Sequence, residues 1–174
     1  AGVEPQSETV WRQADRYHIP RICFVNKLDR VGADFDRCVE MIKDKLYAKP
    51  LPLQAPIGAE DDYLGVIDLV RMKGYVWNDP VGEKYDEIEI PADLADSAKK
   101  HRESMIELLA ENSDVIMEKY IEGLEPGESE LVSAIRDVTL SAKLFPVFCG
   151  SALRNKAIQP LLDAIVAYLP SPRD

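Results

Sequence analysis

The chain has 174 residues, of which 46% are hydrophobic and 30% charged, enough for one globular domain with an inserted part. No stretch reaches the ~18 to 20 consecutive apolar residues that a membrane-spanning helix needs, which excludes membrane insertion. Lys and Arg number 21 against 31 Asp and Glu, a net charge of -10. This sign argues against a general nucleic-acid binder, because the phosphate backbone is itself negative.

Three cysteines, Cys23, Cys38 and Cys149, cannot all pair in disulfides. Cys23 and Cys149 lie within apolar runs, where a free thiol behaves as a small hydrophobic side chain. A reducing compartment is therefore expected. Residues 1–6 carry no signal peptide and read as a loop taken from a longer chain.

The two ends of the chain predict an α/β arrangement. A helix over 7–17 precedes a short, unbroken apolar run at 21–25, which is typical of a parallel strand buried on both faces. The apolar spacing over 34–46 predicts the helix that follows it. The same order recurs near the C-terminus, with a buried strand at 145–149 and a helix over 156–169 that has one apolar face.

The middle of the chain has a different texture, with many Pro and Gly residues between short β-prone segments. It predicts strands at 51–57, 66–77 and 85–90, then helices over 92–111, 113–121 and 128–140. Residues 86–130 hold 14 acidic residues and 4 Lys or Arg, so the net charge of the chain is concentrated there. Two interpretations stay open for these helices: a solvated face, or a docking surface for a basic protein partner.

Two short motifs follow the two buried strands directly. Asn26-Lys27-Leu28-Asp29 comes after the first, and Gly150-Ser151-Ala152-Leu153 comes after the second. In open α/β sheets, ligands bind in the crevice at the carboxyl ends of the strands. The position of the motifs therefore predicts that both contribute to one ligand site.

The chemistry of these motifs matches a guanine base. The Asp29 carboxylate can accept from both the ring N1–H and the exocyclic amine of guanine, whereas adenine lacks that amine and would be rejected roughly a thousandfold. Asn26 can donate toward N7 or O6 while the other end of its amide ties neighbouring loops together, and the stem of Lys27 can cover the purine face. Ser151 can hydrogen-bond locally, and Ala152 is small enough for its N–H to reach O6. The alternative is that Asn26 and Asp29 only cap the following helix or form a turn.

The sequence contains no group that would hold phosphates. Its 9 glycines form no G-x-x-x-x-G-K-[ST] loop. The pattern Asp-x-x-Gly occurs at 62–65 and 79–82, but in turns beyond the base motif, where it is a chance match. We predict no catalytic residue and no metal ligand in the chain.

Further stretches, spread over more than 160 positions, are more specific than either base motif. They are Gly2-Val3-Glu4-Pro5-Gln6, Trp11-Arg12-Gln13-Ala14, Asn26-Lys27-Leu28-Asp29-Arg30, Gly32-Ala33-Asp34, Pro52-Leu53-Gln54, Pro56-Ile57-Gly58, Val66-Ile67-Asp68-Leu69-Val70, Met117-Glu118-Lys119-Tyr120, Cys149-Gly150-Ser151-Ala152, Asn155-Lys156, Asp163 and Tyr168-Leu169-Pro170-Ser171-Pro172. Together these stretches resemble translation elongation factor G, the ribosomal translocase. Single departures occur at Leu28, Leu153 and Ala157, where many members have Met, Phe and Gly; none removes a polar contact.

The resemblance implies an α/β fold, the C-terminal part of a P-loop-GTPase-type G domain with two parallel strands. That part would comprise 1–45 and 143–170, interrupted by an inserted α+β subdomain at 46–142 and followed by the start of a linker at 171–174. Ser151 follows Asp29 by 122 positions, far more than a simple crossover needs, which agrees with an insert. The guanine-nucleotide-binding residues would be Asn26, Lys27, Asp29, Ser151, Ala152 and Leu153.

The resemblance also implies a function. The parent protein would bind GTP or GDP with Mg²⁺ and couple GTP hydrolysis to movement of tRNA and mRNA on the ribosome. Its phosphate loop and Mg²⁺ ligands would lie upstream of Ala1, so this chain alone is expected not to hydrolyse GTP. Its partner would be the ribosome, including the stalk protein, which the acidic insert would contact. Its location would be the cytoplasm, either the bacterial cytosol or an organellar matrix.

Two alternatives remain. The chain could belong to another translational GTPase, of the release-factor or ribosomal-protection type, or it could be a non-catalytic module that docks a partner. A further expectation concerns the sheet: an inner strand without its neighbour exposes an apolar edge, which favours self-association.

Overall fold

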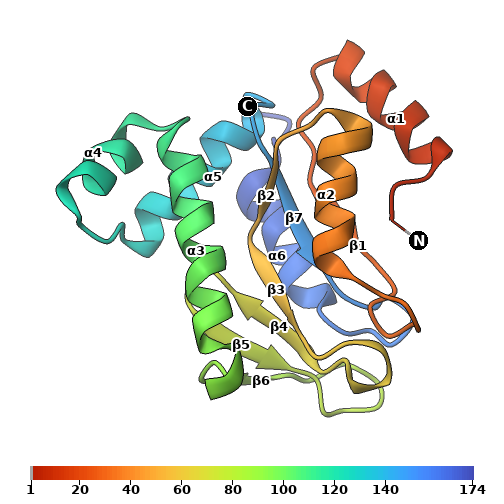
Figure 1. The fold of residues 1–174 in the computed structure, drawn as a ribbon. Coiled ribbons are helices and arrows are strands. Elements are labelled where there is room, and N and C mark those ends of the chain that lie inside the picture. Colours follow the sequence, from red (N-terminus) through yellow and green to blue (C-terminus); the bar gives the residue numbers. More distant parts are fainter. Residues whose placement is uncertain (1) are drawn as a thin grey trace.

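A three-stranded parallel sheet joins the N- and C-terminal parts of the chain. In the computed structural model, which describes residues 2–174, β1 (Cys23–Val25) pairs with β7 (Phe145–Cys149), and β7 pairs with β2 (Pro50–Pro52). Figure 1 shows α2 (Phe35–Leu46) in front of these strands and α6 (Ile158–Tyr168) behind them. Helices on both faces of a parallel sheet define the α/β class that the sequence predicts.

A four-stranded antiparallel sheet adjoins the parallel one, in the order β3-β4-β5-β6. The prediction of a single strand over 66–77 is wrong, because the chain turns back between β4 and β5. The Asp68 carboxylate accepts from the N–H groups of Val70 and Arg71, at 2.8 and 3.1 Å, and this fixes the turn. The strands are β3 (Gln54–Ile57), β4 (Gly65–Asp68), β5 (Lys73–Val76) and β6 (Asp86–Ile88).

The strand predicted over 51–57 is in fact two strands that belong to different sheets. At the joint, the N–H of Leu53 donates to Val147 O at 3.1 Å, and the carbonyl of Leu53 accepts from Leu69 N–H at 3.0 Å. The parallel sheet therefore has three strands rather than the predicted two, and the third comes from the part predicted to be an insert. One continuous segment connects both sheets.

The predicted helices are present, with ends shifted by a few residues. The Asp34 carboxylate accepts from Arg37 N–H at 2.9 Å and so caps α2. Gly123, with φ 69°, ends α4 in the left-handed conformation. The remaining helices are α1 (Pro5–Arg16), η1 (Glu60–Asp62), η2 (Ala92–Leu94), α3 (Ala95–Ala110), α4 (Asp114–Glu122) and α5 (Glu128–Leu140).

Two apolar cores stabilise the molecule, and each contains residues from both sheets. One joins Leu51 and Leu69 to α3, α5 and α6. The other joins Val147 of the parallel sheet and Trp77 of the antiparallel part to α2. Burial is therefore shared, and we expect the two sheets to fold as one cooperative unit.

No helix within residues 2–174 is long and apolar enough to cross a bilayer.

One edge of the parallel sheet is open. Within residues 2–174, β1 pairs on one side only, with β7. Self-association through that edge stays a prediction.

The Gln54 side chain continues the parallel ladder where the backbone leaves it. This residue is 3% exposed, and its Oε1 accepts from the N–H of Cys149 at 3.1 Å. Gln54→Leu would leave that buried N–H without a partner, so we expect the free energy of unfolding to fall by about 1–3 kcal/mol. Urea denaturation measures the loss. Gln13→Leu, at an exposed position of α1, is the control and should cost little; equal effects would contradict the assignment.

Candidate functional site

The pairing of β1 with β7 brings the two predicted loops side by side. Val25 lies opposite Cys149 in the register, and Gly150 N–H donates to Val25 O at 3.1 Å. The N–H of Leu28 then donates back to Gly150 O at 3.2 Å. The carboxyl ends of the two strands, far apart in the chain, therefore form one site.

Asn26 connects the loops through its side chain. Its Oδ1 accepts from the N–H of Lys27 at 2.8 Å and from the N–H of Ala152 at 2.9 Å. The sequence predicts an Ala152 N–H available to a base, and here that group is already engaged. A guanine O6 would have to replace the Asn26 carbonyl at this donor, which the free amide nitrogen of Asn26 permits, since no residue among 2–174 accepts from it.

Asp29 carries the negative charge of the site. Its side chain is 13% exposed, and Oδ2 lies 3.6 Å from Arg154 Nε. The side chain of Ser151 is the largest influence that lowers the pKa of Asp29; backbone hydrogen bonding and Arg154 also lower it, against burial, which raises it. An aspartate is ionised at neutral pH at its ordinary pKa, and the lowered pKa extends that charged form to more acidic solution.

One oxygen of Asp29 has no partner. Its Oδ1 is buried and receives no hydrogen bond from the residues described, 2–174. A buried acceptor left unpaired costs free energy, and native proteins leave few of them. A carboxylate can accept from two adjacent N–H groups of one ligand, the arrangement that guanine has.

The second loop is shaped by close backbone contacts. A Cβ on Gly150 would lie 2.6 Å from Lys156 O and 2.9 Å from Phe24 Cζ, so only glycine fits there. Ser151 is fully buried and forms an isolated bridge with Lys156, which closes the loop. Leu153, by contrast, is 79% exposed at the loop tip.

Lys27 is exposed and adopts the left-handed conformation, with φ 66°. The structure thus brings together Asn26, Asp29, Ser151 and Ala152, and it leaves Lys27 and Leu153 at the rim.

Sequence reasoning missed three residues that support this site: Arg154, Lys156 and Tyr63. Arg154 faces Asp29, and the Nζ of Lys156 donates to Tyr63 O at 2.7 Å. Arg154 lies three positions beyond Ser151, so its charge was a signal that could have been used. Tyr63 could not have been found from the sequence. No local pattern shows which part of the antiparallel subdomain, the sheet β3–β6 with its connections over 54–88, lies against the loops.

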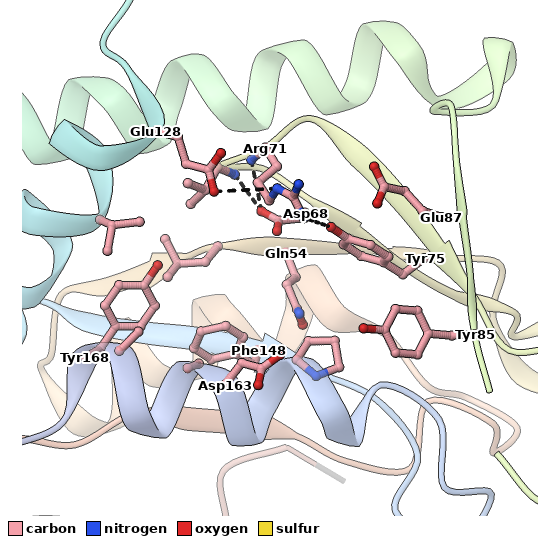
Figure 2. A pocket seen from close by; sticks show the side chains of 16 residues that line it. Gln54, Asp68, Arg71, Tyr75, Tyr85, Glu87, Glu128, Phe148, Asp163 and Tyr168 are labelled. Atoms are coloured by element: carbon pink, nitrogen blue, oxygen red, sulfur yellow. Dashed lines mark hydrogen bonds and ion pairs between the residues drawn. The ribbon is translucent and has the colours of Figure 1, made fainter. Parts of the chain in front are cut away.

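Two hollows lie near the parallel sheet. One, of about 450 Å³, reaches Asn26 and Lys27 and extends along β1 beneath α1 and α2. The other, of about 290 Å³, lies between the antiparallel sheet and α6, and it holds none of the predicted site residues. Figure 2 shows it, with Gln54 at its centre and Arg71 bonded to Tyr75.

No three His, Cys, Asp or Glu side chains gather in a way that could hold a metal ion, as far as residues 2–174 are concerned. Metal ligands are therefore not assigned to any residue of the site.

The fold and the paired loops define a G-domain-type α/β protein, in which parallel strands present a nucleotide site at their carboxyl ends. The sequence matches the elongation factor Tu GTP binding domain over residues 1–171. The chain belongs to this family, the translational GTPases, whose members bind guanine nucleotides.

A solved structure supports the same family. A crystal structure of a protein from Thermus thermophilus superimposes with a TM-score of 0.86 at 31% sequence identity. The match covers 99% of this chain and 25% of that one, so the chain spans about a quarter of the length of this relative.

Tyr63 offers a test of the packing behind the site. Its side chain is 1% exposed, and its hydroxyl is buried without a hydrogen-bond partner among residues 2–174. Tyr63→Phe removes this unpaired group, so we expect the free energy of unfolding to stay the same or to rise by about 1 kcal/mol. Chemical denaturation gives the value, with the exposed Tyr17→Phe as control. A loss above about 1 kcal/mol would show that the hydroxyl makes a bond.

Proposed function

We propose that this chain is the guanine-base-recognition part of a ribosomal translocase GTPase of the elongation factor G type. The observation that carries the proposal is the buried, unpartnered oxygen of Asp29 beside a second loop that is bonded to Asn26. The resemblance of the sequence to elongation factor G extends it from the family to translocation of tRNA and mRNA.

The roles of the individual residues follow from the geometry. Asp29 would accept from N1–H and the exocyclic amine, and the Asn26 amide would donate toward N7. Ala152 N–H would turn from Asn26 to O6, while Lys27 and Leu153 at the rim would cover the base. Ser151, buried in the second loop, lowers the pKa of Asp29 and so favours its charged form. Adenine would leave the Asp29 carboxylate facing a lone pair, which is the basis of selectivity.

GTP hydrolysis is assigned to groups that these 174 residues do not contain. Phosphoryl transfer depends on Mg²⁺ and on fixed charge around the γ-phosphate. The sequence has no Gly-rich phosphate loop, so the chain alone should bind GTP or GDP weakly and leave GTP intact. Mg²⁺ would be held by other parts of the parent protein.

The acidic helices are proposed to dock the ribosomal stalk protein. Besides their charge, they expose apolar side chains on and just after α4: Val115 is 56% exposed, Ile121 75% and Leu124 54%. Exposed apolar side chains among acidic ones suit a basic partner with its own apolar contacts. The same observation favours partner docking as the alternative function of this part. A protein that acts on the ribosome would work in the cytoplasm or in an organellar matrix.

Asp29→Asn tests the base assignment. An amide offers one donor, which suits the carbonyl that xanthine has in place of the guanine amine. We expect the ratio of guanosine to xanthosine affinity to fall by roughly 100-fold or more. Saturation-transfer NMR with the two nucleosides detects such weak binding.

The matched control is Asp44→Asn, at an exposed position of α2, which removes the same charge and should keep the preference for guanosine. An unchanged ratio in Asp29→Asn would remove this residue from the role proposed.

A further inference from the structure

We infer that Glu60, a residue of the antiparallel subdomain, positions Asp29 for guanine by clamping the loop that carries it. This inference rests on the proposed function and adds to it a specificity-determining residue outside both base motifs. The residue lies in η1, in the connection from β3 to β4, which Figure 1 shows beside the loop between β1 and α2.

Glu60 contacts the base loop, the segment 26–32 that carries Asp29, at two points. Its backbone N–H donates to the carbonyl of Leu28 at 2.9 Å, and its Oε1 accepts from the N–H of Gly32 at 2.8 Å. These points lie on either side of Asp29. Because a carboxylate acceptor strengthens a hydrogen bond, the contact with Gly32 is the stronger of the two.

The peptide groups next to Asp29 are fixed from two directions. The N–H of Leu28 donates to Gly150 O, in the loop after β7, and the carbonyl of Leu28 accepts from the N–H of Glu60. Within the loop, the N–H of Arg30 donates to Lys27 O at 3.1 Å and closes a turn. This turn leaves Asp29 little freedom between the two anchors. The direction of its carboxylate is therefore set partly by the antiparallel subdomain.

The clamp is built at a local cost. Glu60 has φ 57°, in the left-handed region that non-glycine residues seldom adopt. Such a conformation persists only where the surroundings determine it, and strained residues of this kind gather at functional sites.

The same short segment also holds the second loop. Three residues beyond Glu60, the carbonyl of Tyr63 accepts from Lys156 Nζ, and Lys156 bridges to Ser151. Residues 60–63 thus touch both halves of the base site, which makes them a common support for Asp29 and Ser151.

The test compares guanosine with inosine, which lacks the exocyclic amine that Asp29 is proposed to read. Glu60→Ala removes the acceptor for Gly32, so we expect the guanosine preference to fall about tenfold while inosine binding stays nearly constant. Glu60→Gln keeps an acceptor and should restore the preference. Asp61→Ala, an exposed neighbour, should leave it unchanged. A general loss of stability would weaken both nucleosides equally and would contradict a positioning role.

A second measurement needs no ligand. Amide hydrogen exchange of the unaltered chain should show Gly32 protected, and Glu60→Ala should speed its exchange about tenfold or more. An unprotected Gly32 amide, or a preference retained in Glu60→Ala, overturns the clamp. If the unaltered chain does not distinguish guanosine from adenosine, the proposed function fails instead, and the exchange data still report on the clamp.

Discussion

The candidate site depends on the register between β1 and β7. Because Val25 lies opposite Cys149, the loops after both strands start at the same edge of the sheet. A shift of one residue would turn every side chain of a strand to the other face, so the buried packing of Val147 and Cys149 also fixes the loops. The core and the site are therefore two results of one pairing, and Gln54 extends that pairing where β2 ends.

Around this pairing, the antiparallel subdomain acts as a support. Its residues enter both apolar cores, and its β3–β4 connection reaches the base loops through Glu60 and Tyr63. A subdomain packed in this way can pass a change at its own surface to the loops, because packed elements shift together. The acidic helices and the base site belong to one body of structure.

Much of the fold could be predicted from local patterns. The unbroken apolar runs at 21–25 and 145–149 indicated the parallel strands β1 and β7, and the residues after them indicated the site. Burial on both faces was right for β7 and wrong for β1, which is half-buried because it lies at the edge of the sheet. Asp34 and Gly123 marked helix ends through their own conformational preferences.

Long-range pairing could not be predicted in this way. Nothing near Leu53 shows that its two sides pair with different sheets. Leu69 and Val70 are buried although they form a turn, so their hydrophobicity continued the apparent strand. The helix over 156–169 was predicted with one apolar face, yet Val166 is 83% exposed. The residue type of Asn26 predicted a tie between loops, whereas the choice of Ala152 N–H as its partner depends on how the two loops meet.

Amide chemical-shift mapping of the 174-residue chain with GDP, and in parallel with ADP, tests guanine recognition most directly. We expect GDP to shift the amides of 26–30 and 150–153 and ADP to leave them in place. Equal shifts with both nucleotides, or shifts confined to the hollow beside α6, would contradict it.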